Sequence, residues 1–245
     1  MTTMRPGEAW RDRELATRFA AERAHRVPES RVQIDVLLHV LAGRHRPVRS
    51  VVDLGCGDGI LLAMVLAAHP DARGVALDYA PAMRELAASR LAPFGDRASV
   101  AAADLREPGW ARVAGGDVDV VVSGFAIHHL PDARKRALYG EIAGALAPGG
   151  TFLNLEHVAS ATPAIESLAD AAIVAFQAAA RGAAGEAVDV AALRAAYDAR
   201  PDKADNILAP VERQCAWLRE LGFADVDVFW KWFELALFGG TKPCS

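Results

Sequence analysis

Between residues 50 and 157 the sequence alternates between short β-branched runs and longer helix-forming stretches. Such alternation predicts strands joined by helical crossovers, which build a parallel sheet with helices on both faces. The run Asp117–Ser123 holds three consecutive valines, as is typical of a strand buried on both faces. We therefore predict a doubly wound α/β fold. The predicted strands are Ser50–Leu54, Gly74–Leu77, Ser99–Ala103, Asp117–Ser123 and Thr151–Leu155, and the predicted helices are Ile60–His69, Pro81–Leu91 and Pro131–Leu146.

The alternation stops after residue 160. Residues 160–222 are mostly alanine-rich helical segments without a clear strand, which predicts an inserted helical cap. Two strands follow, Ala224–Trp230 and Trp232–Phe238, and their short connection predicts an antiparallel hairpin at the edge of the sheet.

The N-terminal part reads as helical. Residues 8–24 predict an amphipathic helix, and a second helix is expected from Pro28 to about Gly43, since proline suits a first helical turn. We expect two regions: N-terminal helices over residues 1–49 that cover the cofactor site, and a main domain over residues 50–245 with a helical lid inserted at about 160–222.

The composition argues against several classes of protein. Of the 245 residues, 52% are hydrophobic and 24% charged, which suits a large core and argues against global disorder. The net charge of −4 argues against a protein that mainly grips phosphate backbones. Cys56, Cys215 and Cys244 fit no paired zinc spacing and no disulfide framework. No run reaches about 18 consecutive apolar residues, so we expect no membrane-spanning helix. The N-terminus lacks the apolar block of a signal peptide, so we expect a soluble cytoplasmic protein.

The segment Val51–Gly59 (VVDLGCGDG) carries the most chemical information. A buried strand delivers Asp53 to the sheet edge, and Gly55, Gly57 and Gly59 then allow a tight turn that a ligand can approach. The spacing is G-x-G-x-G, whereas a dinucleotide fingerprint would be G-x-G-x-x-G. Asp53 and Asp58 would repel a pyrophosphate and would suit a sulfonium. This argument from charge favours S-adenosylmethionine over NAD.

The ends of the next strands carry suitable groups in order. Asp78 ends the second strand, where an acid can accept hydrogen bonds from a ribose diol, although a helix cap explains it equally well. Tyr79 and Met83 follow it and are candidates for contact with an adenine. Asp104 ends the third strand and could accept from the adenine amino group, while Ser123-Gly124-Phe125 ends the fourth beside the same crevice.

These segments together resemble a known family. The runs VVDLGCGDG, VALDYAPAM, AAADL, DVVVSGFAIHHL and LAPGG are similar to the successive motifs of class I S-adenosylmethionine-dependent methyltransferases. The resemblance is close over about residues 50–157 and looser over 222–242. It implies a seven-stranded, mostly parallel sheet in the order 3-2-1-4-5-7-6, with strand 7 antiparallel.

The resemblance also implies a cofactor site. The loop residues Asp53, Gly55, Cys56 and Gly57 would hold the methionine moiety, and Asp78 the ribose. The remaining cofactor-binding candidates, around the adenine and the methionine end, are Tyr79, Met83, Asp104, Leu105, Ser123 and Phe125. No metal is required by this chemistry.

The predicted acceptor site lies above the fourth and fifth strands, under the helical insert. The catalytic candidates there are His128, His129 and Glu156, because a histidine is a suitable general base near neutral pH. The alternative is that each histidine caps a helix or bonds a backbone carbonyl. In the insert, Arg194 and Tyr197 are three residues apart on one helix face and are candidates to clamp a substrate carboxylate, with a solvated charged face as the alternative.

The sequence predicts a methyltransferase that uses S-adenosylmethionine to methylate a small organic molecule by in-line transfer. Two alternatives stay open: an enzyme that modifies the cofactor, like carboxy-S-adenosylmethionine synthases, and a catalytically silent cofactor-binding protein. The fourth strand lacks the Asn- or Asp-Pro-Pro-Tyr motif used on exocyclic base amines, which together with the net charge argues against methylation of DNA bases. The basic turn at residues 44–49 makes RNA modification a little more plausible, but such a turn is usually only a solvated surface, so we do not expect a nucleic-acid partner. We also expect no membrane partner, and an alanine-rich helix pair leaves a homodimer open.

Overall fold

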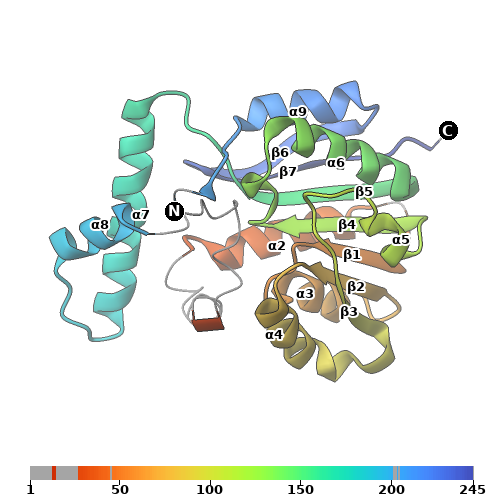
Figure 1. The fold of residues 1–245 in the computed structure, drawn as a ribbon, viewed down its shortest axis with the longest axis horizontal. Helices are drawn as coiled ribbons and strands as arrows, with labels where there is room; N and C mark the ends of the chain where they lie inside the picture. Colours follow the sequence, from red (N-terminus) through yellow and green to blue (C-terminus); the bar gives the residue numbers. More distant parts are fainter. Residues whose placement is uncertain (1–12, 15–26, 45, 201–202, 204, 245) are drawn as a thin grey trace.

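The computed structural model describes residues 13–14, 27–44, 46–200, 203 and 205–244. Seven strands form one sheet in the order β3-β2-β1-β4-β5-β7-β6, which confirms the predicted fold class and strand order. Strand β7 is antiparallel to both of its neighbours, as predicted, and the other pairs are parallel. The strands, drawn in Figure 1, are β1 (Ser50–Leu54), β2 (Arg73–Asp78), β3 (Ala98–Ala102), β4 (Val118–Gly124), β5 (Leu146–His157), β6 (Ala224–Trp232) and β7 (Leu235–Thr241).

The register brings the carboxyl ends of the parallel strands to one edge of the sheet. Leu54 pairs with Leu77 on one side and with Ser123 on the other, so the glycine loop after β1 begins between the ends of β2 and β4. Strand β5 continues along β4, with Leu155 opposite Gly124. Ligands of open α/β sheets bind at such an edge, where the strand order reverses.

Helices cover both faces of the sheet, as predicted (Figure 1). Apolar side chains of α5, α6 and α9 share one core with one face, and those of α2, α3 and α4 share a second core with the other. In β4, Val121 points into the first core while Val120 and Val122 point into the second, and none of the three is exposed to solvent. The helices are α2 (Ser30–Ala42), α3 (Ile60–Ala68), α4 (Pro81–Leu91), α5 (Trp110–Ala114), α6 (Asp132–Ala145) and α9 (Val211–Glu220), with short 3-10 turns η2 (Ala92–Arg97) and η3 (Ile127–His129).

Helices α7 (Pro163–Ala183) and α8 (Val190–Asp198) form a hairpin that projects from the sheet and its helical layers (Figure 1). Thr162 caps α7 by accepting a hydrogen bond from the Ile165 amide, and Pro163 occupies the first turn. Ile173 of α7 packs against Leu193 and Tyr197 of α8. The structure thus contains the predicted helical insertion, and its role as a lid stays a prediction.

The end of the insertion lies earlier than residue 222. Helix α9 lies inside the predicted range, yet Val211 and Leu218 belong to the core between α6 and the sheet. The projecting part therefore ends before residue 211. The predicted helix over residues 8–24 lies outside the described residues, apart from residues 13 and 14, and the second predicted helix is α2.

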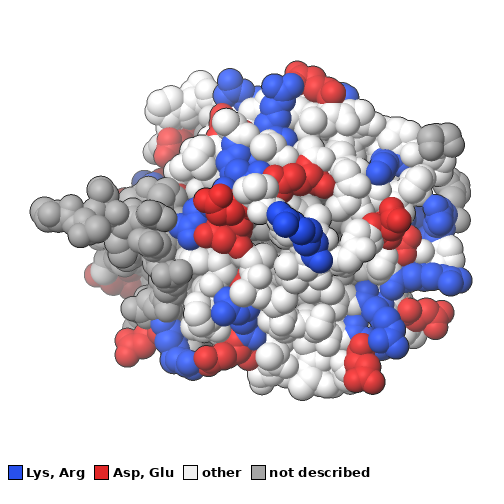
Figure 2. All heavy atoms as spheres, turned by 45° about the vertical axis from the view of Figure 1, so that its right-hand side comes forward, with Lys and Arg blue, Asp and Glu red and all other residues white. Residues whose placement is uncertain are grey.

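One face of the molecule carries charges of both signs (Figure 2). Figure 2 shows basic and acidic side chains interspersed across one face of the molecule. No helix among the described residues is long and apolar enough to cross a membrane.

Candidate functional site

The glycine loop after β1 needs glycine for its backbone. Gly55, Gly57 and Gly59 all have positive φ angles, of 65°, 53° and 77°. A Cβ atom on Gly55 would lie 2.2 Å from the Cβ of Ala126, whereas one on Gly57 would meet only the sulfur of Met83, at 4.0 Å. Gly55 therefore allows the β1 and β4 loops to pack, and Gly57 leaves its outer side open to a ligand.

The two acids of this loop differ in their surroundings. Asp53 is fully buried, and its Oδ2 accepts from the Leu62 amide in the first turn of α3, at 3.2 Å. Asp58 is also buried, but it forms an ion pair with Arg90, with 2.7 Å between Nη2 and Oδ2. Arg90 balances the charge of Asp58, so Asp58 does not act against a pyrophosphate as the sequence suggested.

Asp78 stands at the end of β2 and faces the glycine loop. Its Oδ2 accepts from the Gly57 amide at 2.9 Å, and its Oδ1 accepts from the Ala80 amide at 2.8 Å. Burial raises the pKa of Asp78, and these amide hydrogen bonds oppose the rise. The alternative of a helix cap is wrong, because the N-cap residue of α4 is Ala80 and no side chain caps this helix. The bond to Gly57 places the carboxylate beside the loop predicted to hold the cofactor.

The candidates for the adenine lie along the ends of β2 and β3. Met83 and Leu105 are both buried. Asp104 forms an ion pair with Arg106, at 2.7 Å, and the Arg106 guanidinium lies 5.1 Å from the centre of the Tyr79 ring. Asp104 is thus already paired with a cation, a partner that the sequence reasoning missed.

Two candidates for the methionine end, Ser123 and Cys56, are buried. Ser123 is fully buried, and its hydroxyl donates to the Leu54 carbonyl at 2.8 Å, a bond that explains this residue without a ligand. Phe125 has a φ of 53°, and its amide donates to the Leu155 carbonyl at 2.8 Å. A bulky residue rarely adopts a positive φ, so the backbone is strained at this site. Cys56 is buried, and burial raises the pKa of its thiol well above the ordinary value.

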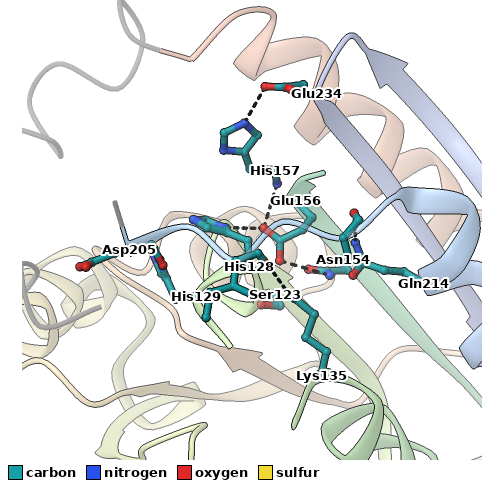
Figure 3. Close-up of polar contacts among 12 residues, drawn as sticks. Ser123, His128, His129, Lys135, Asn154, Glu156, His157, Asp205, Gln214 and Glu234 are labelled. Carbon is teal, nitrogen blue, oxygen red and sulfur yellow. Dashed lines mark hydrogen bonds and ion pairs between the residues drawn. The ribbon is translucent and has the colours of Figure 1, made fainter. Parts of the chain in front are cut away.

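His128 and Glu156 form a buried pair at the ends of β4 and β5 (Figure 3). The distance between His128 Nδ1 and Glu156 Oε1 is 2.5 Å, and Oε1 also accepts from the His157 amide at 2.8 Å. Burial raises the pKa of Glu156 to about 7 and lowers the pKa of His128 well below its ordinary value. When Glu156 is ionised, it accepts the Nδ1 proton and leaves Nε2 of His128 as the basic atom.

The other two histidines have separate partners. His129 Nδ1 lies 3.2 Å from the carbonyl oxygen of Asp205, which can only accept, so His129 carries its proton on Nδ1. Burial and the neighbouring His128 lower the pKa of His129 to about 3, which keeps this ring neutral. His157 Nε2 pairs with Glu234 of the β6–β7 turn at 3.0 Å.

The sequence reasoning missed the polar side chains behind Glu156. Asn154 Nδ2 lies 3.5 Å from Glu156 Oε2 and 3.4 Å from the Tyr139 hydroxyl, which donates to Gln214. All four side chains are fully buried. The sequence could have pointed to Asn154, because residues two apart in a strand share a face and Glu156 is a predicted site residue.

The structure does not bring Arg194 and Tyr197 together as a clamp. The Arg194 guanidinium pairs with Asp198 at 2.8 Å and with Asp170 at 3.5 Å. Tyr197 is buried in the hairpin core, and Arg200 lies 3.8 Å from the centre of its ring. The alternative of a charged helix face explains Arg194 better, and packing explains Tyr197.

Within the described ranges, no group of three or more His, Cys, Asp and Glu side chains is arranged to hold a metal ion.

Comparison with known proteins agrees with this arrangement. Residues 51–150 match the family model described as a methyltransferase domain. The chain is 32% identical over 138 residues to trans-aconitate 2-methyltransferase of Methylobacterium radiotolerans, covering 56% of this chain and 46% of that protein. It is 34% identical over 140 residues to carboxy-S-adenosyl-L-methionine synthase of Geobacter metallireducens, covering 55% and 53%.

A solved structure shares the fold. The O-methyltransferase family protein from Burkholderia thailandensis has a TM-score of 0.62 and 24% identity, over 87% of this chain and 56% of that one. The chain spans about half the length of the two relatives above. The matched region, residues 51–150, holds the glycine loop, Asp78 and His128, and over this region the chain matches the methyltransferase domain family.

Proposed function

We propose that this protein transfers a methyl group from S-adenosylmethionine to a hydroxyl group of a small organic molecule, with His128 as the general base. The observation that carries this proposal is the buried His128–Glu156 pair beside the glycine loop. A hydroxyl group must lose its proton as it is methylated, and a neutral imidazole with a carboxylate at Nδ1 is built to accept that proton.

The chain offers a fitting site for the cofactor. Gly57 is open on its outer side, and the buried carboxylate of Asp78 faces it. S-adenosylmethionine supplies a methyl group activated by a positively charged sulfur. In our proposal, Asp53, Gly55, Cys56 and Gly57 line its methionine moiety, and Asp78 holds its ribose diol. Tyr79, Met83, Asp104 and Leu105 surround the adenine in this proposal, and Ser123 and Phe125 support the loop at the methionine end.

The remaining residues orient the base and the acceptor. Glu156 fixes the proton of His128 on Nδ1, so that Nε2 takes the proton of the acceptor hydroxyl. His129 stays neutral, and the Asp205 carbonyl holds its ring beside that of His128. The projecting α7–α8 hairpin is proposed as a lid that limits the entry of water over the reacting groups.

The experiment is a turnover assay with S-adenosylmethionine and a panel of hydroxylated aromatic and aliphatic acids. Formation of S-adenosylhomocysteine together with an O-methylated product, both identified by mass spectrometry, supports the proposal. The His128→Asn variant serves as control and should still bind S-adenosylhomocysteine. Methylation of nitrogen or carbon acceptors only, or full activity of that variant, contradicts it.

A second function is favoured by one relative. The similarity to a carboxy-S-adenosyl-L-methionine synthase extends over 55% of this chain. If the protein modifies its cofactor, the native mass spectrum of protein purified from cells should show bound carboxy-S-adenosylmethionine. A catalytically silent protein would instead bind S-adenosylmethionine and form no product with any acceptor of the panel.

A further inference from the structure

A short stretch of chain connects the α7–α8 hairpin to α9 and lies directly against the His128 turn. We name residues 205–210 the return segment. The Ile207 amide donates to the His128 carbonyl at 2.9 Å, and the Asp205 carbonyl faces His129 Nδ1. Two consecutive residues of the proposed site are therefore bound to the backbone of the return segment.

Lys135 of α6 binds the same segment from the opposite side. Its Nζ donates to the Ile207 carbonyl and to Asp132 Oδ1, the latter at 3.1 Å. Lys135 is fully buried, which is rare for lysine unless its ammonium is paired. Ile207 is thus held at its amide by the His128 turn and at its carbonyl by Lys135.

A second anchor ties the return segment to the network behind Glu156. Gln214 Nε2 donates to the Ala209 carbonyl at 3.0 Å, and Gln214 Oε1 accepts from the Tyr139 hydroxyl at 2.5 Å. The Ala159 amide, just after β5, also donates to the Ala209 carbonyl, at 3.1 Å. The path of the chain after the hairpin is therefore set by groups that also surround Glu156 (Figure 3).

We propose that Lys135 is a positioning residue, which fixes the return segment against the His128 turn and supplies a buried positive charge to the His128–Glu156 pair. This inference rests on the proposed function, since it gives Lys135 a role in the state of the proposed base. Nothing in the sequence pattern pointed to it, because a lysine on an amphipathic helix is normally solvated.

The electrostatic effect has a definite sign. The charge of Lys135 stabilises ionised Glu156 and opposes protonation of His128, so it lowers the pKa of both groups. Without that charge, the pair should hold its protons to higher pH. The other titratable and charged groups that act on Lys135, His128 or Glu156 are Asp132 on α6, His129 in the same turn, His157 on β5 and Arg200 after α8.

The test compares Lys135→Met with Lys242→Met. Lys242 is a matched control, because its Nζ also donates to a backbone carbonyl, that of Leu146, at the opposite end of β5. Each variant is titrated by NMR with labelled histidine, and the His128 signals are assigned by their absence in His128→Asn. We expect the transition of His128 to move upward by about one pH unit in Lys135→Met only. Hydrogen exchange of the Ile207 amide should be faster in the same variant.

The readouts separate this inference from the proposed function. Equal changes in the two lysine variants, or an unmoved His128 transition in Lys135→Met, would overturn the positioning role, whatever the activity of the enzyme. If Lys135→Met does not fold, Lys135→Gln replaces it, because its amide can still donate to the Ile207 carbonyl while carrying no charge, and the transition should move in the same direction. An unmoved transition in Lys135→Gln then overturns the role. A shifted transition in an enzyme without O-methylation activity would leave Lys135 supported and sink the proposed function alone.

Discussion

The Nδ1 atom of His128 lies 2.5 Å from Oε1 of Glu156, and both side chains are buried. This contact defines the orientation of the imidazole and leaves its other nitrogen for the acceptor. Among the described residues, Nε2 of His128 has no hydrogen-bond partner. The pair therefore combines a fixed proton on one nitrogen with a free basic site on the other.

Replacing His128 by asparagine should lower kcat about 10²–10⁴-fold, which is the usual contribution of a general base. Binding of S-adenosylhomocysteine, measured by calorimetry, should stay unchanged, because this side chain faces the acceptor. His129→Asn is the comparison, since this ring is held by a backbone carbonyl and should matter less. A larger loss in His129→Asn would mean that the two histidines have been assigned the wrong roles.

Activity should depend on the protonation of Glu156. Its pKa is raised to about 7 by burial, and only the ionised carboxylate accepts the Nδ1 proton of a neutral His128. We expect kcat/KM to rise with pH through a midpoint near 7 and then to level off. The measurement is the pH–rate profile with a saturating cofactor, and a profile that is flat between pH 6 and 8 contradicts this assignment.

The same carboxyl group should make stability depend on pH. Since the folded-state pKa of Glu156 is above the ordinary value of 4.5, protonation favours the folded state, and stability is lost as pH rises from about 4.5 to about 7. The loss is on the order of 3 kcal/mol. The Glu156→Gln variant has no carboxyl group to titrate at this position, so it should not show this loss. Between pH 5 and pH 8, the free energy of unfolding measured with urea should therefore fall more in the wild type than in Glu156→Gln. The same pH dependence in both proteins would show that Glu156 titrates normally.

Asp78→Asn tests the location of the cofactor. Removal of the charge that faces Gly57 should weaken S-adenosylhomocysteine binding by about tenfold or more, the effect of one charged hydrogen bond. Asp58→Asn is the control, because that carboxylate pairs with Arg90 and not with the open side of the loop. If calorimetry shows wild-type affinity in Asp78→Asn, the ribose lies elsewhere.

Gly55→Ala tests the loop itself. The new methyl group would collide with Ala126 at 2.2 Å on a backbone with a positive φ, so we expect a loss of about 2–4 kcal/mol of stability. Gly115→Ala also places alanine at a positive φ, but nothing lies within 4 Å of the new Cβ. Its expected cost is only the backbone strain of about 1–2 kcal/mol. Equal losses in thermal unfolding of the two variants would show that the Ala126 contact is unimportant.

The sheet was predictable because strand and helix periodicities are local. The glycines of the β1 loop indicate a tight turn, and the valines of β4 indicate a buried strand, from the local sequence alone. The predicted strand Thr151–Leu155 begins too late, because β5 starts at Leu146 and contains Pro148, Gly149 and Gly150, which normally mark turns. Helix α9 was assigned to the cap, because a short amphipathic segment does not tell which surface it will cover.

The polar network could be predicted only in part. Glu156 lies at the end of β5 and His128 follows the adjacent strand β4, so their proximity follows from the sheet order. Lys135 and Ile207 are 72 residues apart, and no local pattern connects them. Pairings of this kind depend on how the return segment packs, and that becomes visible only once the tertiary structure is formed.

Strand β7 comes last of the seven along the chain, yet it occupies an interior place between β5 and β6. During synthesis, β5 must therefore leave the ribosome with one side unpaired and stay so until residues 235–241 emerge. That exposed edge can recruit chaperones or a second nascent copy before the hairpin covers it.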